Sequence, residues 1–252
     1  MLDFAIIGAG VSGLGAAIEL KGRQVEVFEK SRGFGGRAAT REIDGIHFDH
    51  GANYLSIDEG SLGDWLSENL PNLQKQKVAG AIWTFDAKGE LKPGDPNRDA
   101  STKWTFTDGI NSLGRALAKI CPHPITREIR VAKVEPVDGG WQILDDEGKV
   151  LAQAKQLIFS TPTPQTLEIL PKSFHGPAAA TPTYFRQFAV MLAFDQVIEF
   201  PHNFYAGLNS DRQHRIAWFS REDCKPGRVP SGRSGLVVQL SPDWTAENFE
   251  MD

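Results

Sequence analysis

The chain has 252 residues, a net charge of −5 and a calculated isoelectric point near 5.7. This acidic balance argues against nucleic acid as a partner, because phosphate binding needs clustered Lys and Arg. Hydrophobic residues make up 40% of the chain, as in globular proteins, and no apolar run is long enough to cross a membrane. The two cysteines, Cys121 and Cys224, are isolated. We therefore expect no disulfide framework, no thiolate metal site and a cytoplasmic location.

The start of the chain predicts a dinucleotide-binding unit. The apolar run Phe4–Ile7 predicts a buried strand, and apolar residues at helical spacing predict a helix over Leu14–Leu20. Between them lies a GxGxxG turn, formed by Gly8, Ala9, Gly10, Val11, Ser12 and Gly13. In such a turn the first glycine permits the bend, and the second lets backbone approach a pyrophosphate. The third lets helix and strand pack closely.

An acidic residue follows the second predicted strand, Val25–Phe28. Glu29 lies about 20 positions after Gly8, where a carboxylate accepts hydrogen bonds from an adenosine ribose. A carboxylate there would repel a 2′-phosphate, which argues against NADP and leaves FAD or NAD. An ordinary glycine-rich turn, the alternative, does not require this acid.

A second glycine motif separates FAD from NAD. Gly35 and Gly36 stand just beyond the acid, with Lys30 and Arg37 nearby. A simple nicotinamide dehydrogenase has no need of this motif. FAD lies extended and needs further close backbone approach and positive charge. We expect Arg37 to be buried beside the glycine pair against an anionic group of the cofactor.

Further elements are predicted along the rest of the chain from periodicity and turn residues. In order, they are an extended stretch over 43–53, a helix over 61–70, a hairpin over 79–91, a loop over 92–102, a helix over 110–120, extended runs over 125–137, 141–144 and 150–159, a proline-rich crossing over 162–182, and strands over 188–194, 215–220 and 236–240.

The sequence from Gly8 to Glu42, with its GGR motif, resembles the amine-oxidase-type FAD enzymes. Within that superfamily several stretches resemble the renalase-like branch, namely 48–54, 140–143, 157–162, 216–221, 225–228 and 240–244. The resemblance implies an α/β fold: a Rossmann-like FAD-binding domain, with a parallel sheet and an antiparallel three-stranded excursion, and a smaller α+β substrate domain. It also implies hydride transfer from a small-molecule substrate to FAD, with oxygen as the reoxidant.

The same resemblance implies roles for residues outside the glycine motifs. The segment after Gly51 and Ala52 would pass near the isoalloxazine, where Asn53 and Tyr54 would orient substrate as the catalytic residues. A half-buried structural aromatic is the alternative for Tyr54. Two more positions would lie at the adenosine end of the cofactor, Val131 by its backbone and Thr161.

We expect the FAD-binding domain over 1–78 and 106–165 and the substrate domain over 79–105 and 166–252. Members of the resembled group continue into a Gly-Asp-bearing strand and a Gly/Ala-rich helix that this sequence lacks. We therefore expect the substrate domain to be incomplete and FAD to be held weakly.

Several alternatives stay open. The substrate is a dihydronicotinamide dinucleotide isomer or an amine, and the rival classes are an NAD-dependent dehydrogenase and a non-catalytic, FAD-poor fragment. Arg221 and Arg228 flank a Pro-Gly turn and are expected at the surface, with an anionic-substrate contact as the alternative. His47 and His50 point to opposite faces of an extended stretch, so no metal site is expected.

Overall fold

The structure is a computed structural model that describes residues 1–56, 61–176 and 183–250. It consists of two compact units, unit 1 over residues 1–37 and 113–183 and unit 2 over residues 38–112 and 184–252. Each unit has its own six-stranded sheet. In the part of the chain that is described, no helix is both long and apolar enough to cross a bilayer.

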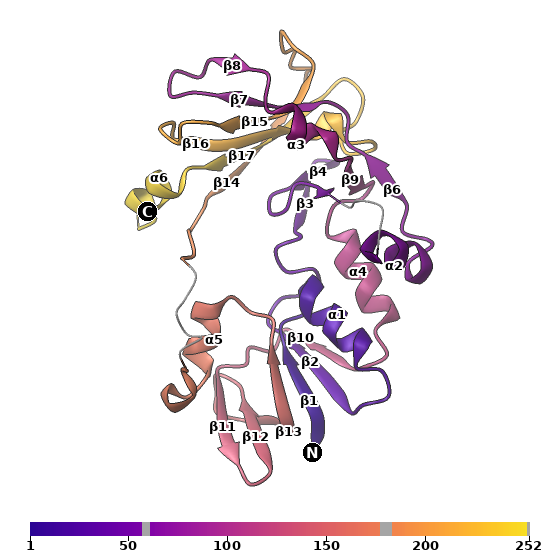
Figure 1. Cartoon of the computed structure of the whole chain (residues 1–252), viewed down its shortest axis with the longest axis vertical. Helices are drawn as coiled ribbons and strands as arrows, with labels where there is room; N and C mark the ends of the chain where they lie inside the picture. Colours follow the sequence, from indigo (N-terminus) through magenta and orange to yellow (C-terminus); the bar gives the residue numbers. More distant parts are fainter. Residues whose placement is uncertain (57–60, 177–182, 251–252) are drawn as a thin grey trace. The chain divides into compact units, whose positions relative to one another are not determined.

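Unit 1 has a Rossmann-like sheet in the order β10–β2–β1–β13–β12–β11 (Figure 1). Its strands are β1 (Leu2–Ile7), β2 (Val25–Glu29), β10 (Ile125–Arg127), β11 (Lys133–Val137), β12 (Gly140–Leu144) and β13 (Val150–Phe159). The neighbours β10, β2, β1 and β13 run parallel, whereas β13, β12 and β11 pair antiparallel. The predicted α/β fold with a three-stranded antiparallel excursion is confirmed.

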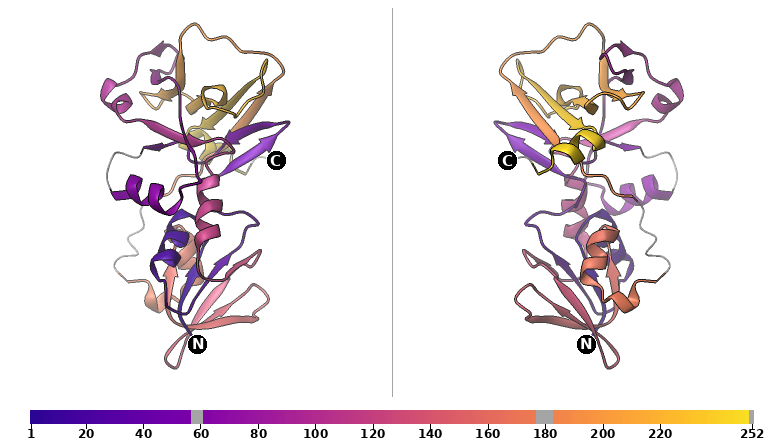
Figure 2. Two further views of the ribbon diagram at one scale, coloured as in Figure 1. Left: turned by 90° about the vertical axis from the view of Figure 1, so that its right-hand side faces the viewer. Right: turned by 90° about the vertical axis from the view of Figure 1, so that its left-hand side faces the viewer.

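The helices of unit 1 follow the strand ends. Its main helices are α1 (Val11–Glu19), α4 (Ser112–Ile120, which starts at the unit boundary) and α5 (Thr163–Ile169), with a 3-10 helix η1 (Lys172–Phe174). The N-terminus lies at one end of the sheet, and the chain reaches α1 only at the far end of β1 (Figure 2). Parallel strands that all end at one edge place their connecting loops together there.

Unit 2 has a sheet in the order β14–β17–β16–β15–β7–β8 (Figure 1). Its strands are β7 (Ala81–Phe85), β8 (Leu91–Lys92), β14 (Ala189–Phe194), β15 (Phe204–Asn209), β16 (Ile216–Arg221) and β17 (Ser234–Leu240). Two smaller sheets are formed by β3 (Thr40–Ile43) and β4 (Ile46–Asp49), and by β5 (Leu55–Ser56), β9 (Lys103–Phe106) and β6 (Lys75–Lys77). Its helices are α2 (Ser61–Asn69), α3 (Pro96–Ala100), α6 (Pro242–Asn248) and the 3-10 helix η3 (Glu222–Cys224).

The first unit boundary, after residue 37, falls earlier than the predicted domain boundary after residue 78, whereas the next two, after residues 112 and 183, fall later than the predicted ones after 105 and 165. Residues 38–78, predicted in the first domain, belong to unit 2. The cause is packing of β4: Ile46 and Phe48, both fully buried, form a cluster with Val237 of β17. Burying two large apolar side chains in that cluster ties the segment to unit 2.

The predicted loop over 92–102 contains a helix, so that prediction was wrong over α3. Asp95 caps this helix by accepting a hydrogen bond from the Asn97 amide at 2.9 Å, and Pro96 begins it. Both features are start signals of a helix.

Candidate cofactor and substrate sites

The GxGxxG turn joins β1 to α1 in a conformation that only glycines allow. Gly8 has a φ of +106°, which L side chains rarely adopt. A Cβ on Gly13 would lie 2.0 Å from the carbonyl oxygen of Gly8. The helix therefore packs on the strand end so closely that no side chain fits between them. Helix α1 begins at Val11, directly after Gly10, and Gly10 supplies no side-chain cap for its first turn. Those orphan N–H groups are the donors that a pyrophosphate takes in such a turn.

The second glycine motif packs directly on the first. The Gly35 amide donates to the Ala9 carbonyl at 3.0 Å, and Gly10 and Gly35 form a bridge. A Cβ on Gly36 would lie 3.2 Å from the Gly10 Cα. On the other side, a Cβ on Gly114 of α4 would lie 2.4 Å from the Gly35 Cα. The two motifs therefore form one backbone surface without side chains.

Gly114 is a residue of this surface that the sequence argument missed. A glycine inside a helical pattern costs about 1 kcal/mol relative to alanine, so its presence in α4 needs a reason. Close approach of the Gly35 backbone is that reason.

Glu29 ends β2 at the same edge of the sheet. Its carboxylate is 8% exposed and accepts hydrogen bonds from the Ala9 amide at 2.7 Å and the Ser31 amide at 2.8 Å. A carboxylate can accept about four hydrogen bonds, so both oxygens keep capacity for ribose hydroxyls. Glu29 also fixes the backbone of Ala9 within the glycine turn.

The other predicted cofactor residues of unit 1 differ in how far their side chains are exposed. Lys30 and Ser12 are exposed, and Val131 is buried in the core of unit 1. The Thr161 hydroxyl pairs with that of Thr166 at 2.7 Å. Arg37 is exposed, so the prediction that it is buried was wrong. Close backbone packing ends at the preceding glycine, where the chain turns with a φ of +59°.

In unit 2, the predicted catalytic residues Asn53 and Tyr54 line a pocket of about 530 Å³. Its other lining residues are Ala52, Ser56, Gln187, Leu208, Ala217, Trp218 and Gln239. Leu208, Trp218 and Gln239 are cross-strand neighbours on β15, β16 and β17. The Tyr54 ring packs against Trp218, with centroids 6.5 Å apart. The pocket thus combines aromatic side chains with neutral amides.

Asn53 is held from three sides. Its Oδ1 accepts from the Ser220 hydroxyl at 3.0 Å, and its Nδ2 donates to the Gly51 carbonyl at 3.3 Å. Its backbone carbonyl accepts from the Tyr205 hydroxyl at 3.3 Å. Gln239 also donates to the Gly51 carbonyl, at 3.2 Å. These contacts fix residues 51–53 against β15, β16 and β17.

Just before this segment in the chain, Asp49 belongs to a buried charge cluster with Glu222, Lys225 and Arg228, and all four side chains are 0% exposed. The Lys225 ammonium is 3.0 Å from Asp49 Oδ2 and 2.9 Å from Glu222 Oε1. Arg228 binds both oxygens of Asp49, at 3.0 and 2.7 Å. Two carboxylates face two cations, so the cluster has no net charge, and charged groups this deeply buried are found only when paired.

This cluster corrects the prediction for the two arginines. Arg228 is not at the surface and is not available to an anionic substrate. Arg221 stacks over the Phe200 ring, 4.8 Å from its centroid, and donates to the Asp223 carboxylate at 2.8 Å. Both guanidinium groups are therefore already engaged within unit 2.

Burial and charge act against each other at these groups. Burial alone would raise the pKa of Asp49, but the charges of Lys225 and Arg228 and their hydrogen bonds outweigh it, and its pKa lies below the usual range. Burial raises the pKa of Glu222, with Lys225 opposing the shift. Burial, reinforced by the negative charges of Glu222 and Asp49, raises the pKa of Tyr205 well above its usual value. The Tyr205 hydroxyl therefore stays protonated as a donor to Asn53.

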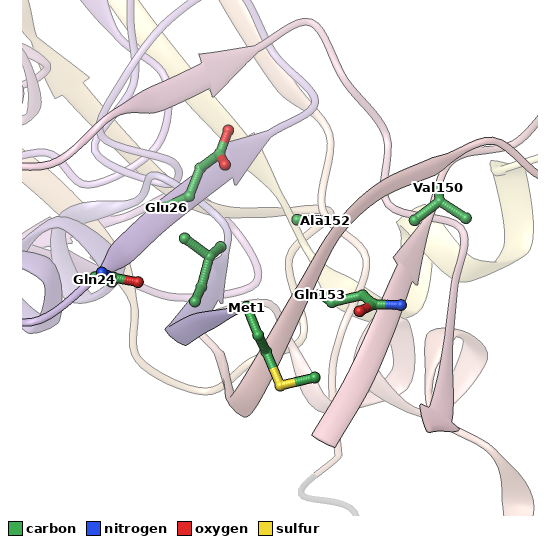
Figure 3. Close-up of a pocket in the computed structure, with 7 residues that line it drawn as sticks. Met1, Gln24, Glu26, Val150, Ala152 and Gln153 are labelled. Atoms are coloured by element: carbon green, nitrogen blue, oxygen red, sulfur yellow. The ribbon is translucent and has the colours of Figure 1, made fainter. Parts of the chain in front are cut away.

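A second pocket, of about 400 Å³, lies in unit 1 (Figure 3). Met1 and Gln24 line it at the start of β1 and β2, and Val150 lines it at the start of β13. This is the amino end of the parallel strands, whereas ligands of open α/β sheets bind at the carboxyl ends. The pocket is therefore separate from the glycine surface. Among the described residues, no group of three His, Cys, Asp or Glu side chains could hold a metal ion.

Comparisons with known proteins agree with the unit 1 geometry. Residues 6–68 match the family described as an NAD(P)-binding Rossmann-like domain. The chain is 43% identical over 75 residues to the mitochondrial protoporphyrinogen oxidase of Nicotiana tabacum, covering 29% of this chain and 15% of that protein. It is 43% identical over 129 residues to the zeta-carotene-forming phytoene desaturase of Myxococcus xanthus, covering 48% of this chain and 22% of that protein. The chain thus spans less than a quarter of the length of these curated relatives.

A comparison of folds finds similarity to solved structures along the whole chain. A triple mutant of putrescine oxidase, made to redesign its cofactor binding, superposes with a TM-score of 0.72 at 15% identity. The match covers 100% of this chain and 78% of that one. At this identity the likeness concerns the fold. The chain therefore contains a Rossmann-like domain that matches the NAD(P)-binding family over residues 6–68, and its fold is like that of putrescine oxidase.

Proposed function

We propose that this chain is an FAD-dependent oxidoreductase of the amine-oxidase and desaturase type. The observation that carries the proposal is the packing of Gly35 and Gly36 against Gly10, which creates one backbone surface from two separate motifs. The match to oxidases and desaturases supports the same class of chemistry. Glu29 at the adjacent strand end completes the set of groups that an adenosine diphosphate moiety requires.

FAD fits this surface better than NAD. A simple nicotinamide site uses the GxGxxG turn and the acid but gives no role to a second glycine pair. Here a Cβ on Gly36 or on Gly114 would meet backbone at 3.2 Å or less, so the second motif is built for close approach. Glu29 disfavours a 2′-phosphate by charge repulsion, which argues against NADP.

When bound, FAD supplies the two-electron chemistry, in which a substrate hydride is accepted and the electrons pass to oxygen. The chain's own residues bind FAD and orient the substrate. The amides at the start of α1 hold the phosphates, and Glu29 accepts hydrogen bonds from the ribose. Asn53 and Tyr54 orient the substrate in the unit 2 pocket. None of these roles requires a protein nucleophile.

For the substrate we favour a dihydronicotinamide isomer, as in the renalase-like branch. The aromatic and amide side chains of the pocket suit a flat ring that carries a carboxamide. Arg221 and Arg228 do not serve as pyrophosphate anchors, because both are engaged elsewhere. The competing candidate is an amine, which the fold likeness to putrescine oxidase favours.

Anaerobic stopped-flow reduction of the FAD-loaded protein tests the proposal. We expect dihydronicotinamide isomers to bleach the flavin absorbance and simple amines to leave it unchanged. Hydride transfer is sensitive to placement, so Asn53→Ala and Tyr54→Phe should slow reduction about tenfold or more while FAD affinity stays unchanged. Rapid reduction by amines alone would replace the renalase-like assignment with the amine-oxidase one. Failure of the chain to take up any flavin would overturn the FAD assignment.

A further inference from the structure

We infer that Ser220 is a positioning residue for Asn53, and that the ion pair between Lys225 and Glu222 directs the Ser220 hydroxyl to Asn53. The inference rests on the proposed role of the unit 2 pocket as the substrate site. It gives the buried charge cluster a part in shaping that pocket.

Ser220 faces Asn53 and Glu222 as acceptors, and it also lies beside the Tyr205 hydroxyl, which itself donates to the Asn53 backbone. It lies on β16 and is fully buried. Its hydroxyl oxygen is 3.0 Å from Asn53 Oδ1 and 3.5 Å from Glu222 Oε1. A hydroxyl has one proton, so it can donate to only one of them at a time. The distance to Asn53 is at the edge of the normal range for such a bond and the distance to Glu222 is well beyond it, so the proton goes to Asn53.

A carboxylate normally competes better for a hydroxyl proton than an amide oxygen, because charge-assisted hydrogen bonds are about twice as strong as neutral ones. Here the Glu222 charge is already met by Lys225, whose ammonium donates to Oε1 at 2.9 Å and to Oε2 at 3.0 Å. Lys225 in turn is held by Asp49 at 3.0 Å. The ion pair thus leaves the Ser220 proton to Asn53.

The hydrogen bond from Ser220 fixes which way the side-chain amide of Asn53 is turned. With Oδ1 turned to Ser220, Nδ2 is turned to the Gly51 carbonyl at 3.3 Å. The terminal torsion of asparagine is broad and readily rotates when nothing holds it. The Tyr205 hydroxyl reaches the backbone carbonyl of Asn53 and not its side-chain amide, so Tyr205 does not replace Ser220 in this role. Without Ser220, only the 3.3 Å bond from Nδ2 to the Gly51 carbonyl holds the side-chain amide, so we expect its orientation to become much less fixed.

Selective labelling of asparagine with 15N makes the Asn53 side-chain NH₂ group observable by NMR, without FAD or substrate. In the native protein we expect an order parameter in the rigid range, about 0.85, and in Ser220→Ala a fall below about 0.6. Ser220→Thr keeps the hydroxyl and should restore the order. The matched control is Thr105→Val, because Thr105 is also buried and accepts from Arg228 at 2.6 Å but makes no contact with Asn53 in the described structure.

A second pair of variants tests the ion pair. Lys225→Met removes the two hydrogen bonds that the Glu222 carboxylate accepts from the ammonium and leaves only the longer contact with Arg228, 3.8 Å away. The Ser220 proton should then move to Glu222, and the Asn53 amide should become mobile. Adding Glu222→Gln removes the competing charge and should restore its order. In the FAD-loaded protein, Ser220→Ala should lower the rate of flavin reduction several-fold with little change in the apparent substrate affinity.

Three results would overturn the inference. An ordered Asn53 amide in Ser220→Ala would show that the hydroxyl does not position it. Equal disorder in Thr105→Val would show a general effect of weakened packing. Persistent disorder in the Lys225→Met, Glu222→Gln double variant would show that the ion pair does not direct the proton. Because the NMR readout requires no cofactor, these results are independent of whether the proposed redox function holds.

Discussion

At the residue scale, the glycine surface depends on whether a single Cβ atom fits at each position. The Cβ that Gly13 lacks would meet the Gly8 carbonyl at 2.0 Å, whereas a Cβ on Gly15, two residues further along α1, would meet nothing within 4 Å. The two glycines occupy one helix in the same sequence context, yet only the first is required by packing. Comparing Gly13 with Gly15 therefore distinguishes the effect of close packing at the cofactor surface from the general effect of glycine on helix stability.

We predict opposite effects of alanine at these positions. Gly13→Ala forces α1 away from β1 and should destabilise the protein and weaken FAD binding. Gly15→Ala should stabilise it by about 0.5–1 kcal/mol, the helix-propensity difference, and leave FAD affinity unchanged. Denaturant unfolding and flavin titration of both variants check this. Equal FAD affinity in the two variants would contradict the assigned surface.

Glu29 carries the second prediction at this scale. Glu29→Gln removes a charge-assisted hydrogen bond to the ribose, worth about 1.5–3 kcal/mol. FAD affinity should therefore fall roughly ten- to hundredfold, as measured by equilibrium titration. The amide oxygen of Gln can still accept from one backbone amide, so folding should change less than binding. An unchanged FAD affinity would count against Glu29 as the ribose ligand.

At the scale of elements, β4 shows what sequence could predict and what it could not. Strands, turns and the first βαβ unit follow from local periodicity and glycine spacing, which the structure confirms for β1, α1 and β2. The attachment of β4 to the rest of unit 2 includes the contacts of Asp49 with Lys225 and Arg228, which lie more than 170 positions away. No local pattern specifies that contact. The helix α3 is a different case, because Asp95 and Pro96 were visible start signals that the loop assignment overlooked.

The buried charge cluster gives a stability prediction with a defined pH dependence. Asp49→Asn leaves two buried cations facing one carboxylate and should cost about 3–5 kcal/mol at neutral pH. The pKa of Asp49 is lowered in the folded state, so its contribution is present above the unfolded pKa of about 3.9 and is lost as pH falls through the lower folded pKa. The difference in unfolding free energy between the native protein and Asp49→Asn should therefore become smaller in strong acid.

Urea unfolding across acidic and neutral pH measures this difference. Asp223→Asn is the control, because the pair of Asp223 with Arg221 is partly exposed and should contribute about 0–1 kcal/mol. Two results would show that the cluster does not hold unit 2 together. One is a loss of unfolding free energy in Asp49→Asn no larger than in Asp223→Asn. The other is a difference between native protein and Asp49→Asn that becomes larger in acid.

At the scale of the whole molecule, the fold class was predictable and the division of the chain was not. Residues after the GGR motif read as a continuation of the first domain, yet Ile46 and Phe48 join the core of unit 2. The proposed site residues are also divided between the two units. The glycine surface and Glu29 belong to unit 1, and Asn53 and Tyr54 belong to unit 2. Local motifs thus gave candidate residues in both units but did not fix the limits of the units that contain them.

We propose that unit 1 selects FAD over the nicotinamide dinucleotides. Parallel equilibrium titrations of the chain with FAD, NADH and NADPH test it most directly. We predict saturable binding of FAD, at least tenfold tighter than that of either nicotinamide dinucleotide, and loss of that preference in Gly36→Ala, where a Cβ would meet Gly10 backbone at 3.2 Å. Tighter binding of NADH than of FAD, unaffected by the Gly36→Ala change, would contradict it.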